Sequence, residues 1–415
     1  MIRILRTLNC PKAPRAVEPT AVDHGCGATD LFPLYIEGLD KMKGLIDTTL
    51  REGAQTIGIS FSLTQKQAIV QALAKTGVEE IELGIATQFD LDLPELMDYC
   101  KQLAGRRPSC SLWSLCRKND IEYAASLRPD VLSLSIPVSD LHIFKKLNKS
   151  RGWVLRTLRK AVGWAQDFGF HKISLGLEDA TRAEPGFLAE IIKIAAECGV
   201  CRLRLADTVG IASPLSIRAL ITAAKANHPM ELCVHTHNDF GMATANCLTA
   251  LESGADWADV TVLGLGERAG NARFEEVAGY MALQKGHYYR TENIPELCRL
   301  VSQAAKQEIS ARQPVIGRDI FTCETGLHLQ GLEIDPMIYE PYAPQRVGGR
   351  RRLVYGSKIG RNSLSKRLES LAISLPLAHI NELTNHMRRK VSELGRPLKD
   401  GEIIDLCAKS GSLAQ

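Results

Sequence analysis

Two histidines one residue apart carry the clearest chemical signal in this chain. The stretch LCVHTHNDFGMATAN (232–246) places His235 and His237 at the end of an apolar run, directly before a polar segment. On a β-strand, residues two positions apart point to the same face, so both imidazoles can reach one point in space. If they bind a metal ion, the remaining ligands must come from elsewhere in the chain.

Polar side chains also follow other apolar runs, at places where a simple turn needs none. They are Asp47, Arg51, Glu52 and Gln55; Glu178, Asp179 and Arg182; Asp207 and Thr208; and Glu267, Arg268 and Asn271. For Asp47 a turn or a buried ion pair is the alternative to a chemical role. For Glu178 and Asp207 an ion-pair or supporting role competes with catalysis. The glycines of the loop 264–270 indicate tight packing beside the site.

Eight short apolar runs, each followed by a helical stretch, are the elements that must position these side chains. The runs span residues 43–49, 79–85, 109–115, 130–136, 172–177, 201–206, 231–237 and 259–264. Between them, TQKQAIVQALAKTG (64–77) has apolar residues at helical spacing and a glycine stop. SPLSIRALITAAKAN (213–227) opens with a serine cap and a proline. Alternating strands and helices predict a parallel sheet.

Eight such units over roughly 240 residues are typical of a closed (β/α)8 barrel. An open, doubly wound sheet is the alternative, but the GxGxxG turn of that class is missing after the first strand. We therefore predict an α/β fold, a (β/α)8 TIM barrel over residues 43–287 with a C-terminal helical accessory region. The other predicted parts are an irregular extension (1–42), a helix and loop subdomain (288–362) and a helical subdomain (363–415).

Such a barrel completes the metal site, because its chemistry takes place at the carboxyl ends of the strands. Glu52 becomes the expected third ligand, since the first strand neighbours the eighth in a closed barrel. Asn271 can add a direct or water-mediated contact. Two imidazoles and one carboxylate leave coordination positions open for substrate, and they suit a divalent cation such as Mg, Mn, Zn or Fe(II).

Composition excludes several other classes of function. The net charge of +4 over 415 residues comes without a lysine and arginine block of the kind that binds nucleic acid. No apolar run reaches the roughly 20 residues of a membrane span, so we expect a cytoplasmic protein. The twelve cysteines are scattered along the chain and are expected to be reduced, mostly buried residues. The basic stretch 348–361 is either a solvated loop or a binding site for an acidic ligand.

Four of these motifs resemble a known family. DTTLREGAQ, LADTVG, HTHNDFGMATAN and GLGERAGN are similar, in this order, to the signatures of the homocitrate, 2-isopropylmalate and citramalate synthase group. The resemblance implies the condensation of acetyl-CoA with a 2-oxo acid that is bound to a divalent metal. It also implies a homodimer in which the C-terminal region of one chain covers the barrel of the other.

The resemblance assigns roles to individual residues. Glu52, His235 and His237 match the metal ligands, and Arg51 matches the arginine that stabilises negative charge developing on oxygen. Gln55 and Thr208 match contacts to the 2-oxo acid. Arg182, with Glu178, matches a position that helps to hold a second carboxylate. The predicted catalytic residues are Arg51, Glu178 and His328; the predicted substrate contacts are Gln55, Arg182, Thr208 and Arg117; the predicted metal contacts are Glu52, His235, His237 and Asn271.

Two stretches, 132–150 and 175–188, are most similar to the compact homocitrate synthases of the nitrogen-fixation type, which implies 2-oxoglutarate as the acceptor. A Re-face citrate synthase that uses oxaloacetate, an isopropylmalate or citramalate synthase, and a carbon–carbon lyase of the same superfamily are the enzymatic alternatives. A non-catalytic protein that binds a 2-oxo acid is the alternative from another class.

The chain departs from the family pattern at three places. Ala54 stands where the first motif usually has glutamate. Cys323 stands where the family has a histidine implicated in acid–base chemistry, and His328, five residues on, is retained. A thiol has an ordinary pKa of about 8.5, against about 6.5 for imidazole, so Cys323 serves as a base only if its surroundings lower that value. The stretch YGSKIGRNS (355–363) lacks the usual Gly-Lys-His-Ser-Gly.

Overall fold

A computed structural model describes residues 42–227, 230–324 and 326–411 of the chain. The predicted extension 1–42 therefore lies outside the described residues, apart from Met42. Among the residues described, no helix combines the length and the apolar character that crossing a membrane requires.

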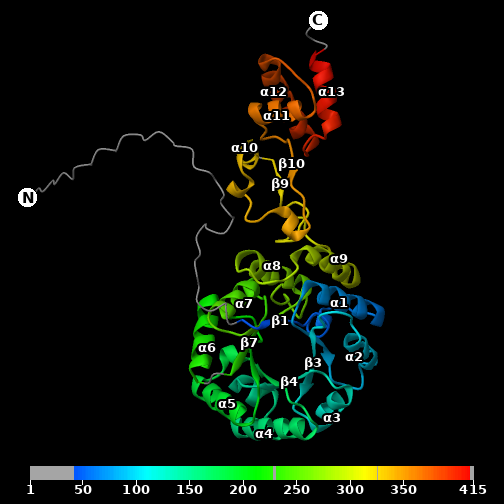
Figure 1. Cartoon of the computed structure of the whole chain (residues 1–415). Helices are drawn as coiled ribbons and strands as arrows, with labels where there is room; N and C mark the ends of the chain where they lie inside the picture. Colours follow the sequence, from blue (N-terminus) through cyan, green and yellow to red (C-terminus); the bar gives the residue numbers. More distant parts are fainter. Residues whose placement is uncertain (1–41, 228–229, 325, 412–415) are drawn as a thin grey trace, which may run out of the picture. The chain divides into compact units, whose positions relative to one another are not determined.

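Eight parallel strands close into a barrel in the order in which they occur along the chain (Figure 1). They are β1 (Gly44–Asp47), β2 (Glu80–Ile85), β3 (Ser109–Leu115), β4 (Val131–Pro137), β5 (Ile173–Glu178), β6 (Arg202–Asp207), β7 (Glu231–Thr236) and β8 (Trp257–Val260). The helices between them are α1 (Leu63–Thr76), α2 (Leu93–Lys101), α3 (Lys118–Leu127), α4 (Arg151–Asp167), α5 (Pro185–Glu197), α6 (Pro214–Asn227), α7 (Ala243–Glu252) and α8 (Phe274–Gln284). The predicted TIM barrel is confirmed, and the open sheet is wrong because β1 pairs with both β2 and β8.

Local sequence signals explain where the helices begin and end. Ser62 caps α1: its hydroxyl accepts from the Gln65 N–H at 3.3 Å, and the Gln65 side chain accepts from the Ser62 N–H at 2.9 Å. The helix stops at Gly77, whose φ of 91° lies in the left-handed region. Ser213 caps α6 by accepting from the Ser216 N–H at 3.4 Å. The predicted serine cap of α6 and the predicted glycine stop of α1 are thus confirmed.

Closure of the barrel sets the positions of the chemical groups. β1 and β8 pair over four residues, from Gly44 opposite Trp257 to Asp47 opposite Val260. The turn after β1 is fixed by the Thr48 carbonyl, which accepts from the N–H groups of Arg51, Glu52 and Gly53. β8 ends at Val260, earlier than the predicted run, because the chain turns at Val262–Gly264 and Leu263 has a φ of 60°.

Residues after the barrel form further elements. They are α9 (Ile294–Ala305), β9 (Thr322–Cys323), α10 (Gly326–Ile334), β10 (Arg352–Leu353), α11 (Arg361–Ser370), α12 (Leu377–Leu394) and α13 (Asp400–Gly411). The buried face of α9, including Leu297 and Val301, belongs to the hydrophobic core of the barrel. A separate apolar cluster, with Leu364, Leu383 and Met387, holds α11 and α12 together. This is the predicted C-terminal helical region.

One expectation about the cysteines is wrong. Cys100 on α2 and Cys110 on β3 form a disulfide, and both side chains are fully buried. The pair joins a helix to the strand that follows it, a contact that depends on packing and not on a CxxC spacing. The other cysteines among the described residues form no disulfide, as expected.

Candidate metal centre and active site

Glu52, His235 and His237 converge on one point at the carboxyl end of the barrel. Their ligand atoms all lie within 4.8 Å of one another. The two Nε2 atoms are 3.2 Å apart, and His237 Nε2 is 3.7 Å from Glu52 Oε1. All three side chains are buried. Two imidazole nitrogens and a carboxylate oxygen at these separations form a donor set that fits a divalent cation.

The alternation of β7 produces this convergence. His235 and His237 face the site, while Thr236 between them turns away and donates its hydroxyl to the Ala243 carbonyl at 3.0 Å. Glu52 reaches the same point from the turn after β1. The third candidate ligand thus comes from a segment distant from β7 in the sequence. Closure of the barrel brings that segment next to the histidines.

Asn271 lies against the two histidines, and its predicted contact to a metal stays a prediction. It forms an isolated bridge with His237, and its Nδ2 is 3.4 Å from His235 Nε2. Its Oδ1 is buried without a partner among the described residues. A Cβ on Gly266 would stand 1.9 Å from that oxygen, so a larger residue there would displace the Asn271 side chain. An unpaired buried oxygen beside the three ligands supports the fit to a cation.

The charge states also suit metal binding. Burial and the neighbouring His235 lower the pKa of His237 to about 3, so its imidazole is neutral at pH 7. Burial opposes the charge of Glu52, but Arg51 holds the pKa of that carboxyl below its usual value. A neutral imidazole and an ionised carboxylate are the forms that bind metal ions.

His235 is anchored from behind by β8. Its Nδ1 lies 2.9 Å from Asp259 Oδ2, and Asp259 is fully enclosed in the barrel. The same carboxylate is 3.0 Å from Arg204 Nε. Although burial disfavours its charge, Arg204 keeps the pKa of Asp259 below its usual value, so the group is an anion. An imidazole that donates Nδ1–H to this anion leaves Nε2 free for a metal.

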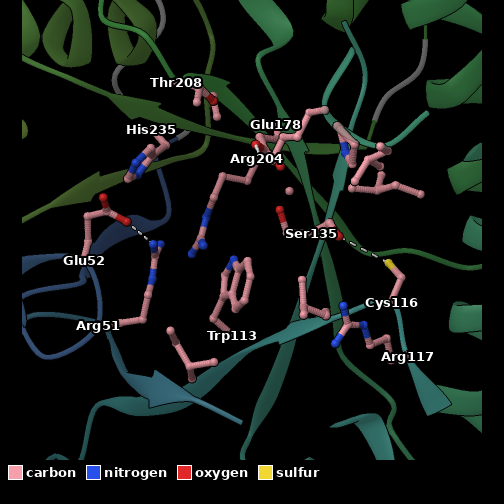
Figure 2. Close-up of a pocket in the computed structure, with 18 of the residues that line it drawn as sticks. Arg51, Glu52, Trp113, Cys116, Arg117, Ser135, Glu178, Arg204, Thr208 and His235 are labelled. Carbon is pink, nitrogen blue, oxygen red and sulfur yellow. Dashed lines mark hydrogen bonds and ion pairs between the residues drawn. The ribbon is translucent and has the colours of Figure 1, made fainter. Parts of the chain in front are cut away.

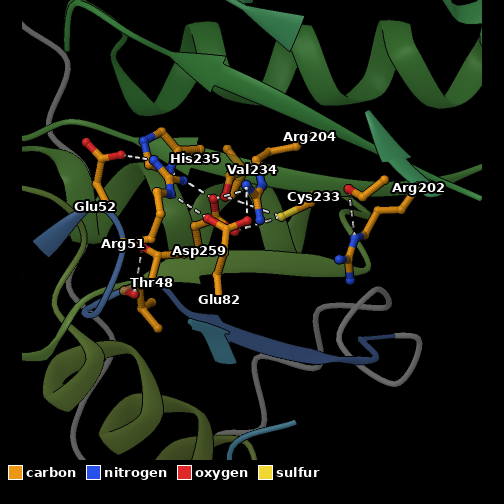
Figure 3. Close-up of polar contacts among 12 residues, drawn as sticks. Thr48, Arg51, Glu52, Glu82, Arg202, Arg204, Cys233, Val234, His235 and Asp259 are labelled. Atoms are coloured by element: carbon orange, nitrogen blue, oxygen red, sulfur yellow. Dashed lines mark hydrogen bonds and ion pairs between the residues drawn. The ribbon is translucent and has the colours of Figure 1, made fainter. Parts of the chain in front are cut away.

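A second carboxylate, Glu82 on β2, joins Arg204 to Arg51 (Figure 3). Arg204 Nη1 donates to Glu82 at 2.8 Å, and Arg51 Nε donates to it at 2.6 Å. Arg51 also pairs with Glu52. Sequence reasoning missed Glu82, Arg204 and Asp259. The available signal was that charged residues alternate with apolar ones in β2 and β6, and that Asp259 interrupts the apolar β8.

A cavity of about 620 Å³ opens beside the three candidate ligands. It is lined by eight of the residues predicted from the sequence, namely Arg51, Glu52, Gln55, Arg117, Glu178, Thr208, His235 and His237. Trp113, Ser135, Arg204, Lys149 and Trp153 also line it. Figure 2 shows Cys116 and Arg117 on the side of the cavity away from Glu52 and His235. The cavity therefore has a metal end and a basic end.

Thr208 and Arg182 differ in what they offer to a ligand. The Thr208 hydroxyl oxygen accepts from the Asp179 N–H at 2.8 Å, which leaves the hydroxyl hydrogen free to donate into the cavity. Arg182 does not line the cavity; its Nε and Nη2 each donate to Asp179 at 2.8 Å. Glu178 lines the cavity and accepts from Lys146 at 2.5 Å.

His328 and Cys323 lie in the elements that follow the barrel. His328 is exposed on α10, and its ring packs 4.2 Å from the ring of Tyr339. Cys323 is half-buried in β9. Neither lines the cavity within this chain, and the role predicted for His328 remains a prediction.

Solved structures share the barrel. Hydroxymethylglutaryl-CoA lyase from Pseudomonas aeruginosa superposes with a TM-score of 0.57 at 18% identity, over 65% of this chain and 94% of that one. The HMG-CoA lyase from Brucella melitensis gives 0.56 at 20% identity, over 64% of this chain and 99% of that one. At these identities the likeness shows the fold alone.

Sequence comparisons go further. Residues 43–303 match the HMGL-like family, and residues 315–394 match the family described as homocitrate synthase post-HMGL domain-like. The homocitrate synthase of Frankia alni is 41% identical over 331 residues, which cover 78% of this chain and 92% of that protein. The 2-isopropylmalate synthase 2 of Caldanaerobacter subterraneus is 36% identical over 373 residues, covering 88% of this chain and 95% of that protein. The chain is therefore an acyltransferase-type enzyme that belongs to the HMGL-like family, among the homocitrate and 2-isopropylmalate synthases.

Proposed function

We propose that this enzyme condenses acetyl-CoA with 2-oxoglutarate and hydrolyses the resulting thioester, to give homocitrate. The observation that carries the proposal is the meeting of Glu52, His235, His237 and Arg51 in one cavity. The similarity of the chain to the homocitrate synthase of Frankia alni supports the choice of reaction. The cytoplasmic location and the homodimer predicted from the sequence belong to the same proposal.

A divalent cation held by Glu52, His235 and His237 would supply Lewis-acid polarisation of the 2-oxo carbonyl. Arg51 lies beside Glu52 and lines the cavity, so its guanidinium can stabilise the negative charge that develops on that oxygen. Thr208 offers a hydroxyl hydrogen to the acceptor's carboxylate. A general base takes a proton from the acetyl methyl group, the enolate carbon adds to the 2-oxo carbonyl, and water then cleaves the thioester to release CoA.

The basic end of the cavity supports a dicarboxylic acceptor. Arg117 and Lys149 both line it, and Lys149 Nζ lies 5.9 Å from the Trp153 ring. A carboxylate at the far end of the acceptor would meet positive charge there. Arg182, which we expected to hold that group, already pairs with Asp179. We therefore propose Arg117 for this contact.

Release of CoA from acetyl-CoA, measured for the full chain with Mn²⁺, tests the proposal across 2-oxoglutarate, oxaloacetate, pyruvate and 2-oxoisovalerate. We expect the highest kcat/KM with 2-oxoglutarate, and no release by the His235→Ala variant. Equal or greater turnover with another acid would overturn the substrate assignment. If Mn²⁺ and 2-oxoglutarate bind but CoA is never released, the chain is a non-catalytic binding protein.

A further inference from the structure

Two glutamate–arginine pairs cross the barrel interior between β2 and β6. The rim-side pair is Glu82 with Arg204, and the inner pair is Glu80 with Arg202, two residues earlier on the same strands. Both arginine side chains are 4% exposed. Arg202 donates to the two oxygens of Glu80 at 2.9 and 2.7 Å. The pairs are therefore matched in chemistry, burial and strand position.

The pairs differ in what they contact next. Beyond Glu80, Arg202 reaches Ser174 Oγ at 3.3 Å and the face of the Trp257 ring at 4.9 Å. Neither of these residues is a candidate metal ligand. In Figure 3, Arg202 lies apart from the cluster around Arg204. None of these contacts of the inner pair reaches a candidate metal ligand.

The rim-side pair is joined to the candidate metal centre on two sides. On one side Arg204 forms an ion pair with Asp259, whose Oδ2 lies 3.0 Å from Arg204 Nε and 2.9 Å from His235 Nδ1. On the other side Glu82 accepts from Arg51 Nε at 2.6 Å, and Arg51 pairs with Glu52. Arg204 is therefore connected, through one intermediate or two, to both His235 and Glu52.

His237 has no comparable support. Its Nδ1 is buried and has no hydrogen-bond partner among the described residues. The two imidazoles are thus held unequally: His235 has a carboxylate behind it, and His237 does not. A carboxylate behind a ligating imidazole fixes both the tautomer and the orientation of the ring. We therefore expect the metal affinity of the centre to depend on the contact between His235 and Asp259.

We propose that Asp259 and Arg204 are positioning residues that set the divalent-metal affinity of this enzyme, whereas Arg202 and Glu80 stabilise only the fold. Asp259 keeps the His235 lone pair at Nε2 directed at the cation, and Arg204 keeps the Asp259 carboxylate in place. This inference rests on the proposed metal site, and it goes beyond the ligands themselves.

Titration of the full chain with Mn²⁺ alone, followed by the electron paramagnetic resonance signal of free Mn²⁺, measures the affinity without any catalytic readout. We expect Asp259→Ala to raise the Mn²⁺ Kd by about 10- to 100-fold. Asp259→Asn should raise it less, because an amide oxygen can still accept from His235 Nδ1–H. Arg204→Met should raise it in the same direction as Asp259→Ala.

Arg202→Met is the matched control, because it removes an equally buried arginine from the same strand and leaves an unpaired glutamate. Both arginine variants should lose thermal stability, but the Mn²⁺ Kd of Arg202→Met should stay within about twofold of the wild type. If Arg204→Met does not fold, the two Asp259 variants decide alone.

The outcomes separate this inference from the metal site itself. A wild-type chain that binds no Mn²⁺, or a His237→Ala variant that binds as tightly as wild type, overturns the proposed site. A wild type that binds Mn²⁺ together with an unchanged Kd in Asp259→Ala overturns the positioning role alone. An equal loss of Mn²⁺ affinity in Arg202→Met and Arg204→Met would show that both arginines act only through the general stability of the fold.

Discussion

Arg51 and Glu52 are neighbours in the sequence whose side chains contact each other, and each alters what the other can do. Burial would favour the neutral carboxyl of Glu52, but Arg51 keeps it ionised by lowering its pKa. Burial also opposes the charge of Arg51, which Glu82 and Glu52 restore by raising its pKa. The result is a fixed positive charge beside a ligand that is ready to bind a cation.

Arg51→Met should lower kcat by about 100- to 1,000-fold, because it removes a donor aimed at charge that appears only in the transition state. Steady-state kinetics with acetyl-CoA and 2-oxoglutarate, on protein of measured Mn²⁺ content, would check this. Arg51→Lys should retain part of the activity, since an ammonium keeps the charge without the forked geometry. A loss that merely follows the loss of bound metal would contradict the assigned role.

Arg117 and Arg182 lead to opposite expectations for acceptor binding. Arg117→Ala should raise the KM for 2-oxoglutarate by about 10- to 100-fold. This factor corresponds to the free energy lost with one hydrogen bond to a charged group. It should change the KM for pyruvate little, because pyruvate has no second carboxylate. Arg182→Ala should leave the KM for both acids nearly unchanged, since Arg182 pairs with Asp179. A larger effect from Arg182→Ala would restore the expectation drawn from the sequence.

β1 and α8 each bury a carboxyl group with a raised pKa. Burial raises the pKa of Asp47 to about 7, against the opposing hydrogen bonds from Thr49. Burial raises the pKa of Glu275 on α8 to about 7 as well. The two groups repel each other when both are ionised. Asp47, for which the sequence left a structural role open, thus accepts from Thr49 and does not line the cavity.

Because the pKa of Asp47 is raised in the folded state, the stability of the fold should depend on pH. A carboxyl whose folded-state pKa is raised stabilises the fold fully below its unfolded pKa of about 3.9, and that contribution is lost as pH rises through about 7. Thermal melts should show a fall in Tm of the wild type between pH 5 and pH 8, and a smaller fall in Asp47→Asn. Asp98→Asn, at an exposed position of α2, is the control. Parallel profiles for Asp47→Asn and the wild type would contradict the buried-acid account.

Most of the elements and the candidate metal ligands could be predicted from the sequence, because the elements and the histidine pair depend on local pattern and Glu52 follows once the barrel is assumed to close. Apolar runs, caps and stops located the strands and helices, and the spacing of His235 and His237 located the site. Glu82, Arg204 and Asp259 could not be found in this way. Their charges are compensated across the barrel by residues far away in sequence, and only the pairing of strands reveals those partners.

At the scale of the whole molecule, the loops at the carboxyl rim carry exposed apolar side chains. Ile57 follows β1, Phe89 follows β2 and Phe240 follows β7, and these are 97%, 93% and 70% exposed. Large exposed apolar side chains gathered on one face are typical of an interaction surface. They support the homodimer predicted from the sequence, which itself stays a prediction.

Placing charge on this rim should separate the subunits if the rim is an interface. The double variant Phe89→Lys and Phe240→Lys should sediment as a monomer at micromolar concentration, where we expect the wild type to be a dimer. Tyr288→Lys adds charge after α8, near Glu79 at the other end of β2, and should remain dimeric. A wild type that is monomeric, or a double variant that remains dimeric, would argue against an interface at the rim.

The candidate metal centre lies across the seam at which the barrel closes. Glu52 follows the first strand, the histidines lie at and just after the end of the seventh, and Asn271 follows the eighth, which pairs with the first. A nascent chain therefore has no centre until nearly the whole barrel has been synthesised. A bound cation favours only the closed form, by about 2.7 kcal/mol at a hundredfold excess over its Kd. Metal uptake should thus come late in folding and report that the ring of strands is complete.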